Sequence, residues 1–194
     1  MKNPNIKIKK TEILSDNWAT LSKITLDYTK EDGTVEEQKR EVYERGNGAA
    51  ILLFNKIKKT VVLIKQFRLP TYLNQNETGF IIEACAGVLE EEHPEETIIR
   101  ETEEETGYRI HEVKKIFKSY MSPGSVTEII HFFVAEYDSE MKISKGGGLA
   151  SEHENIEVIE MPFEQAYNMI ASGEIVDAKT IMLLQYAKIN QLLS

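Results

Sequence analysis

The sequence lacks the features that define several classes of protein. Cysteine occurs once, at Cys85, so no disulfide can form within the chain, which is typical of a reducing compartment. No apolar run approaches the about 18 residues of a membrane-spanning helix, and the first residues have no apolar signal segment. Positive charge is scarce, because 23 Lys and Arg face 32 Asp and Glu, a net charge of −9. We therefore expect a cytoplasmic protein that binds neither membranes nor nucleic acid.

The chain does have enough apolar sequence for a globular core. It has 194 residues, of which 41% are hydrophobic and 28% charged, which suits one domain of ordinary size with an appendage. The four histidines show no zinc spacing. Cys85 lies between two alanines in an apolar run, so we expect it to be a core residue and not a nucleophile.

The first 45 residues alternate between apolar and polar side chains in the manner of β-strands. We expect three strands, at 6–9, 18–28 and 34–43, that form an antiparallel sheet. Such a sheet is too small to be stable alone, so it should pack on another surface, and a second subunit is one candidate. Trp18 is more often a core residue at such a position, but an exposed Trp there would stack on a nucleobase.

Residues 46–194 carry the pattern of an α/β domain. Apolar strands alternate with helices, which predicts a mixed sheet with helices on both faces, an α/β/α sandwich. The expected strands are 49–54, 60–65, 80–85, 112–120, 128–137 and 156–160, and the expected later helices are 162–172 and 179–193. A run of three glycines, 146–148, should open a flexible acidic loop.

The strongest chemical signal runs from Gly87 to Tyr108. Pro94 suits the first position of a helix, and Gly107 suits a left-handed cap at its end. At about 100° per residue, Glu101, Glu104 and Glu105 then share an arc of roughly 100°. An acidic solvated face is the commoner fate of such a helix. A metal site is the alternative, because Mg²⁺ prefers oxygen ligands and shares its coordination with phosphates.

The order of glycine, arginine and glutamates favours the metal site. The segment Arg100-Glu101-Thr102-Glu103-Glu104-Glu105-Thr106-Gly107-Tyr108 resembles the end of the Nudix box, Gly-x5-Glu-x7-Arg-Glu-U-x-Glu-Glu-x-Gly-U, in which U is bulky and apolar. Thr102 stands where an aliphatic residue is usual. The spacing from Gly87 to Arg100 is one residue shorter than the pattern, so either Glu92 or His93 takes the first Glu position. The resemblance implies the Nudix fold and hydrolysis of a nucleoside diphosphate linked to another group.

Segments outside the box resemble one subgroup, the GDP-mannose pyrophosphatases, close kin of the ADP-ribose pyrophosphatases. They are 13–18, 39–48, 121–124 and 146–148, and Pro123 is a marker of the nucleotide-sugar branch. The resemblance implies hydrolysis of GDP-mannose to GMP and mannose 1-phosphate by a homodimer. ADP-ribose is the alternative substrate, and a non-catalytic nucleotide-sugar sensor is the alternative of another class, against which the intact box argues.

The resemblance also implies roles for single residues. Mg²⁺, or Mn²⁺ in its place, is expected on the Ala86 carbonyl and on Glu101, Glu104, Glu105 and Glu154, with the number of ions left open. Catalysis is expected from Glu105 and from Glu154, with Glu152 as the competing base. The expected substrate contacts are Trp18, Lys39, Arg40, Glu41, Arg68, Ala86, Gly87, Val88, Glu105, Glu128, His153, Glu154 and Lys179.

Overall fold

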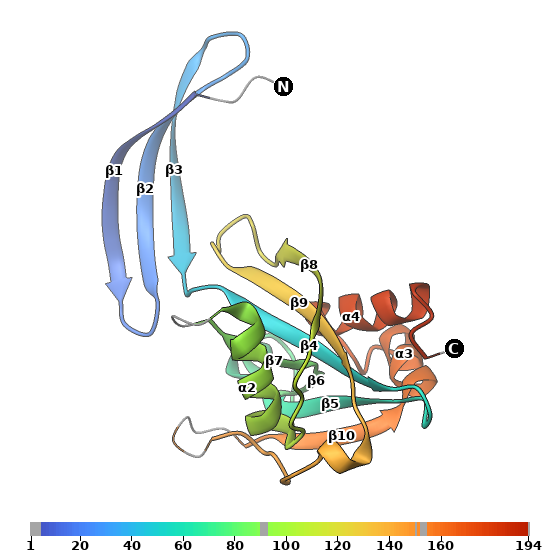
Figure 1. The fold of residues 1–194 in the computed structure, drawn as a ribbon. Helices are drawn as coiled ribbons and strands as arrows, with labels where there is room; N and C mark the ends of the chain where they lie inside the picture. Colours follow the sequence, from blue (N-terminus) through green and yellow to red (C-terminus); the bar gives the residue numbers. More distant parts are fainter. Residues whose placement is uncertain (1–4, 90–92, 150, 152–154, 194) are drawn as a thin grey trace. The chain divides into compact units, whose positions relative to one another are not determined.

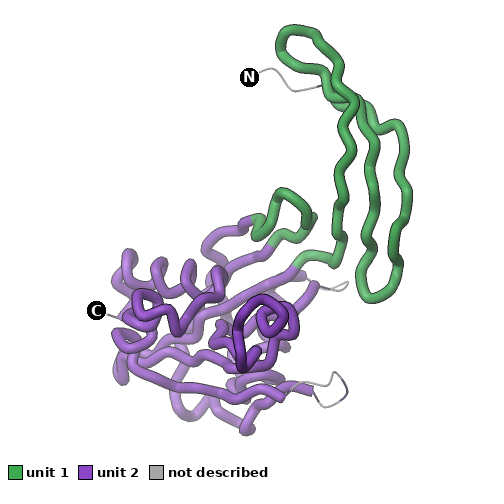
Figure 2. Tube along the Cα trace, turned by 180° about the vertical axis from the view of Figure 1, so that it is seen from behind, with its two compact units in different colours: residues 1–47, 120–129 green, residues 48–119, 130–194 purple. Residues whose placement is uncertain are grey.

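The computed structural model describes residues 5–89, 93–149, 151 and 155–193. The chain divides into two compact units, shown in Figure 2. Unit 1 comprises residues 1–47 and 120–129, and unit 2 comprises residues 48–119 and 130–194. Unit 1 therefore takes a segment from the middle of the chain, which the sequence reading assigned to the second domain. Within the described residues, none of the helices has the length and apolarity that a bilayer span requires.

Unit 1 contains a three-stranded antiparallel sheet in the order β1-β2-β3, as the alternating pattern predicts (Figure 1). Its strands are β1 (Asn5–Asp16), β2 (Thr20–Thr29) and β3 (Val35–Glu44). β1 is longer than expected, and its pairing with β2 shifts register twice along its length. Each shift interrupts the period-2 alternation, so the pattern could show only the first part of the strand.

Several apolar side chains on the outer strands β1 and β3 are exposed, while those of the central strand β2 are partly covered. Ile8, Ile13 and Val35 each expose more than half of their surface, and Trp18, in the turn between β1 and β2, exposes 74%. The sequence reading placed Trp18 inside the second strand, which is wrong by two residues at that end. A sheet of three strands has no second layer of its own to cover these side chains.

The segment 120–129 belongs to unit 1 because it pairs with the end of β3. The backbone N–H of Tyr43 donates to the Ser125 carbonyl at 2.8 Å, and the N–H of Thr127 donates to the Tyr43 carbonyl at 3.1 Å. Val126 forms a parallel bridge with Tyr43. The segment after Pro123 is thus an extra edge on the N-terminal sheet.

Unit 2 is built on a seven-stranded mixed sheet (Figure 1). The path runs β10-β5-β4-β9-β8, with β6 paired to β5 and β7 paired to β4. β4 and β9 are parallel, and the pairs β4–β5, β5–β6, β4–β7 and β5–β10 are antiparallel. The strands are β4 (Gly48–Asn55), β5 (Thr60–Phe67), β6 (Phe80–Glu83), β7 (Cys85–Val88), β8 (Lys114–Tyr120), β9 (Ile129–Glu136) and β10 (Glu157–Pro162).

Helices cover both faces of this sheet, which confirms the predicted α/β/α sandwich. β4 is buried along its whole length, and successive side chains of a strand face opposite layers. Ile51 packs with Ile98 of α2 in one core layer, and Leu52 is equally buried on the face where α4 lies. The helices are α1 (Leu69–Leu73), α2 (Pro94–Thr106), α3 (Phe163–Ser172) and α4 (Ala178–Ile189), with a 3-10 turn at Ser139–Met141.

One expected strand, 80–85, is in fact two strands that divide at Ala84. β6 pairs with β5, where Glu83 lies opposite Ile64, and β7 pairs with β4, where Cys85 lies opposite Ile51. The chain therefore changes its partner strand within one apolar run. Local apolar character does not encode the partner, so the sequence alone showed a single strand.

Candidate active site

The helix α2 has the boundaries that its end residues predict. Pro94 opens it after His93, which is the N-cap, and Glu95 and Glu96 lie in the first turn, where the helix dipole favours them. Gly107 ends it in the left-handed conformation, with φ of 77° and its N–H bonded to the Glu103 carbonyl. The two ends of α2 are therefore determined by residues within and next to the helix.

The acids of α2 lie in three different environments. Glu105 is buried, with 1% of its surface exposed. Glu101 and Glu104 are partly covered, with 16% and 26% of their side chains exposed. Glu103 turns to solvent, where Arg109 binds it at 2.8 Å and holds the pKa of its carboxyl below the usual range. The inward acids and the solvated one are thus on different sides of the same helix.

Arg100 connects two of the inward carboxylates. Its Nη1 lies 2.8 Å from Glu104 Oε2 and 3.1 Å from Glu101 Oε1. This cation offsets the repulsion between like charges at helical spacing. The sequence reading gave Arg100 no role of its own, although its i,i+4 spacing to Glu104 is a sufficient signal for the pair.

β7 brings backbone groups against this acidic face. The Ala86 N–H donates to Glu105 Oε2 at 3.2 Å. Gly87 lies so close to α2 that a Cβ at this position would overlap the Glu101 side chain. Only glycine therefore lets the strand approach the acids this closely.

The donor chemistry of this face fits a hard divalent cation. The carboxylates of α2 offer only oxygen, which is the ligand type that Mg²⁺ prefers, and the Ala86 backbone lies beside them through its N–H bond to Glu105. Because Gly87 has no side chain, β7 places only backbone against Glu101 at this position. Within the described ranges, no three His, Cys, Asp or Glu side chains are gathered as a ready-made metal site, and Arg100 holds two of the acids.

Thr102 and Cys85 are buried residues close to Glu105. Thr102 is fully buried, and its hydroxyl donates to the Ile98 carbonyl at 2.6 Å, so the polar group at this usually aliphatic position is satisfied. Cys85 Sγ lies 3.9 Å from that hydroxyl. Burial raises the pKa of the Cys85 thiol well above its usual value, and the charge of Glu105 raises it further. Cys85 is thus an inert core residue, as expected.

The three glycines 146–148 are docked against the end of α2. The Gly147 N–H donates to the Glu105 carbonyl at 2.9 Å, and the Gly148 N–H donates to the Glu104 carbonyl at 3.1 Å. All three glycines have positive φ, between 67° and 114°. These residues satisfy carbonyls that the helix end leaves without a partner, and that role needs a left-handed backbone. Residues 150 and 152–154 of the acidic loop that follows lie outside the described residues, so the flexibility of that loop stays a prediction.

Two predicted substrate residues of unit 2 meet at a buried acid. Arg68 follows β5, and its Nε lies 2.7 Å from Glu83 Oε2, while Lys179 Nζ lies 3.5 Å from Glu83 Oε1. Glu83 is 3% exposed and ends β6. The sequence reading did not single out Glu83, although one acid inside the apolar run 80–85 was a visible signal.

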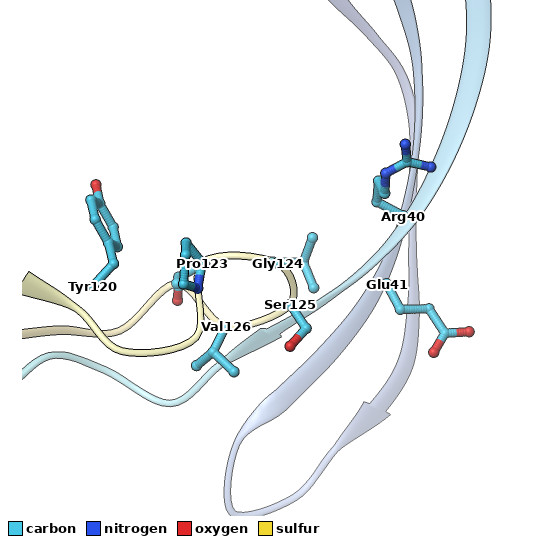
Figure 3. Close-up of a pocket in the computed structure, with 9 residues that line it drawn as sticks. Arg40, Glu41, Tyr120, Pro123, Gly124, Ser125 and Val126 are labelled. Carbon is cyan, nitrogen blue, oxygen red and sulfur yellow. The ribbon is translucent and has the colours of Figure 1, made fainter. Parts of the chain in front are cut away.

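Unit 1 has its own cavity, of about 620 Å³. Arg40 and Glu41 of β3 lie on one side of it, and the turn from Pro123 to Ser125 lies on the other, with Tyr120 nearby (Figure 3). The Arg40 guanidinium donates to the Lys39 carbonyl at 2.9 Å and to Gln38 Oε1 at 3.0 Å. Two of the predicted substrate residues thus line one hollow with the segment 120–127.

Arg45 links two further predicted residues of unit 1. Its guanidinium carbon lies 5.1 Å from the centre of the Trp18 ring, a cation–π distance, and its Nε lies 3.3 Å from Glu128 Oε1. Trp18 and Glu128 are 110 positions apart in the chain, so no local pattern reveals this contact. The sequence reading assigned no role to Arg45.

Comparison with protein-family models identifies the larger part of the chain. The model of the NUDIX domain matches residues 44–184. The chain belongs to the Nudix family. A second model, the GDP-mannose pyrophosphatase NudK N-terminal domain, matches residues 5–43. Nudix hydrolases act with a divalent cation, which agrees with the oxygen donors on α2 and β7.

Curated relatives extend this likeness over almost the entire chain. Proteins named GDP-mannose pyrophosphatase from Escherichia coli O1:K1 / APEC, Shigella dysenteriae serotype 1 (strain Sd197) and Escherichia coli O157:H7 are each 55% identical over 188 residues. In each case the match covers 97% of this chain and 97% of the relative. Both Nudix parts, the N-terminal sheet and the main domain, therefore have counterparts in these proteins.

The predicted site residues fall into three groups within this Nudix chain. Unit 1 contains Trp18, Lys39, Arg40, Glu41 and Glu128. Unit 2 contains Arg68, Ala86, Gly87, Val88, Glu101, Glu104, Glu105 and Lys179. Glu92, Glu152, His153 and Glu154 lie outside the described residues, so the choice between Glu152 and Glu154 as base stays a prediction.

The docking of glycines on the Nudix helix predicts a large loss of stability for Gly146→Ala. A Cβ there would overlap the backbone of Glu105 and Thr106, and φ is 67°. Strain at positive φ and overpacking together should lower the free energy of unfolding by roughly 2–4 kcal/mol, measured by urea denaturation. Gly173→Ala is the control, because φ is 80° but no atom lies within 4 Å. Equal losses in both variants would show that the glycine docking adds nothing.

Proposed function

We propose that the protein hydrolyses GDP-mannose to GMP and mannose 1-phosphate with Mg²⁺, or Mn²⁺ in its place. The observation that carries this proposal is the 55% identity, over 97% of both chains, to proteins named GDP-mannose pyrophosphatase. The arrangement of α2 and β7 supports it, because oxygen donors for a divalent cation are packed against the backbone of Ala86 and Gly87.

The metal-binding residues in this proposal are the Ala86 carbonyl, Glu101, Glu104 and Glu105, with Glu154 as a further ligand. When bound, the cation screens the negative charge of the diphosphate and lowers the pKa of a coordinated water. Arg100 neutralises Glu101 and Glu104 in the present structure. Its long side chain can turn to solvent when a cation takes over that neutralisation, because 36% of it is already exposed.

In this proposal the diphosphate is bound by two positively charged side chains and by the backbone of unit 2. Arg68 offers a planar fork of N–H donors, which matches phosphate oxygens, and Lys179 adds a second positive charge. Gly87 and Val88 bring the β7 backbone to the same ligand. Phosphoryl transfer depends mainly on positioning and electrostatics, so these contacts supply much of the catalysis. Glu154, or Glu152, takes the proton of the attacking water, and His153 contacts the substrate.

Residues 1–45 serve as a dimerisation and substrate-binding subdomain in this proposal, next to the catalytic domain 46–194. The exposed apolar side chains of β1 and β3 support a homodimer, because an isolated three-stranded sheet is marginal. Trp18 stacks on the base, while Lys39, Arg40, Glu41 and Glu128 bind polar groups of the nucleotide sugar. The single cysteine and the net charge of −9 support a cytoplasmic location without nucleic-acid or membrane partners.

Side-by-side kinetics with GDP-mannose and ADP-ribose test this function. Release of GMP and mannose 1-phosphate is followed with Mg²⁺, and kcat/KM should be at least about tenfold higher for GDP-mannose, a transition-state difference of ~1.4 kcal/mol. A preference for ADP-ribose would assign the same chemistry to the other substrate. No phosphomonoester from any nucleotide sugar, with binding retained, would show a sensor and would refute hydrolysis.

A further inference from the structure

Glu83 is a buried carboxylate that binds two cations from different elements of unit 2. It ends β6 and is 3% exposed. Oε2 accepts a hydrogen bond of 2.7 Å from Arg68 Nε, at the junction of β5 and α1, and Oε1 lies 3.5 Å from Nζ of Lys179, at the start of α4. A buried carboxylate is costly unless it is paired, so this acid is retained together with its partners.

The pairs of Glu83 continue into the start of α4. Lys179 Nζ lies 2.7 Å from Oδ1 of Asp177, the N-cap of that helix. Asp177 Oδ2 accepts from the Thr180 N–H at 2.9 Å and from the Thr180 hydroxyl at 2.7 Å. The Thr180 hydroxyl in turn accepts the Ala84 N–H at 2.7 Å. The residue that follows Glu83 is therefore held by the same helix that provides Lys179.

The contact with Arg68 leaves the outer end of the guanidinium available. An arginine that only stabilised the fold would gain most from two parallel bonds to its carboxylate. Glu83 instead binds Arg68 through one oxygen, Oε2, which accepts a hydrogen bond from Nε. The Arg68 side chain is 41% exposed. Within the part of the chain that the structure describes, Arg68 donates its side-chain hydrogen bond through Nε and none through its Nη atoms. Four N–H donors are thus oriented by a buried anchor and remain free for a ligand.

The acid that anchors these two cations lies on the segment that leads into the acidic face. Glu83 and Ala84 directly precede β7, where the Ala86 N–H binds Glu105 at 3.2 Å and Gly87 contacts Glu101. A shift of Glu83 would therefore move the cations relative to the residues proposed to hold the metal. Positioning within fractions of an ångström is what phosphoryl transfer demands.

We propose that Glu83 is a positioning residue, which fixes Arg68 and Lys179 so that their remaining N–H donors bind the diphosphate of the substrate. This inference rests on the proposed function for the identity of the substrate. It does not require that the sugar or the base be those of GDP-mannose, because both cations recognise phosphate oxygens.

The test compares Glu83→Gln with the wild type in two measurements. Glutamine keeps the size and one acceptor for Arg68, but it removes the charge and presents an amide to the second cation. KM for GDP-mannose should rise about tenfold with kcat changed less than about threefold, the pattern of lost uniform binding. Titration calorimetry with inorganic pyrophosphate, without metal, should show a Kd raised by about tenfold as well. Unchanged KM and Kd in the folded variant would overturn the proposal.

Two further variants separate positioning from loss of structure. Glu83→Asp keeps the buried charge but shortens the side chain, so it serves if the glutamine variant does not fold, and the same rise in KM and Kd is expected. Glu160→Gln is the matched control, because Glu160 is also shared between partners, Tyr108, Tyr137 and Lys58, in unit 2. Its stability should fall without a change in KM. An equal rise of KM in the control would overturn the specific role of Glu83.

A double-mutant cycle with Arg68→Lys completes the test. If Glu83 acts through Arg68, the two substitutions together should raise KM by clearly less than the product of their separate effects. Independent, multiplicative effects would refute that linkage. Should the wild type cleave no nucleotide sugar, the proposed function fails, while the pyrophosphate titration still decides whether Glu83 positions the cations.

Discussion

Glu105→Gln is expected to lower kcat/KM by about 10³-fold or more while the protein remains folded, because the change removes charge from the proposed metal site. Glu105 is 1% exposed and accepts the Ala86 N–H through Oε2. Glutamine has nearly the same shape and still offers one oxygen acceptor. Because glutamine fills the same space and keeps an acceptor for the Ala86 N–H, the metal-free variant should unfold at a urea concentration close to that of the wild type.

Glu103→Gln is the matched control for this prediction. It makes the same substitution two residues away on the same helix, but Glu103 faces solvent and pairs with Arg109. Its activity should stay close to that of the wild type, and its stability should change little, because solvent screens an exposed ion pair. Calorimetry with Mn²⁺ should show weakened uptake only in Glu105→Gln. Full Mg²⁺-dependent turnover in Glu105→Gln would remove this residue from the mechanism.

Gly87→Ala is expected to lower kcat/KM by about 10²-fold, the usual cost of misplacing a metal ligand. The added Cβ would overlap Cγ, Cδ and Oε1 of Glu101. Because these atoms belong to a flexible side chain, the overlap is relieved when Glu101 swings away from β7. Stability should therefore change by less than about 1.5 kcal/mol, while Mn²⁺ affinity measured by calorimetry falls together with activity.

A cycle with Glu101→Gln shows whether Gly87 acts through that acid. In the Glu101→Gln background the added methyl group has no ligand left to displace, so Gly87→Ala should cost little further activity. If the two losses multiply instead, the methyl group blocks the substrate or distorts β7 directly. Either way, the cycle separates the steric role of the glycine from the coordination role of the acid.

The helix α2 could be read from the sequence because its signals are local. Pro94, the acids of the first turn and Gly107 each act within one helical turn, and they define the same boundaries in the structure. The α/β/α sandwich could also be predicted from local signals, because the pattern of apolar and polar residues along an element shows which of its faces is covered. Thr102 departs from the family pattern without consequence, because its hydroxyl bonds to the Ile98 carbonyl of its own helix.

Contacts between residues that are far apart in the chain could not be predicted from the sequence. Glu83 lies 96 positions from Lys179, and nothing near either residue in the sequence announces the pair. The same holds for Arg45, which connects Trp18 to Glu128. A glycine run can serve for backbone freedom or for positive φ, and only the three-dimensional partner shows that the glycines 146–148 serve the second purpose at the end of α2.

The pairing of Tyr43 with the segment 120–129 has a consequence for how the chain assembles during synthesis. The edge that completes the N-terminal sheet is made about 80 residues after β3, when residues 48–119 of unit 2 have been synthesised and residues 130–194 have not. Loop closure over that separation is slow compared with the formation of neighbouring strands. The N-terminal sheet, which is translated first, is therefore completed late, and a cut after residue 47 separates residues 120–129 from the compact unit to which they belong.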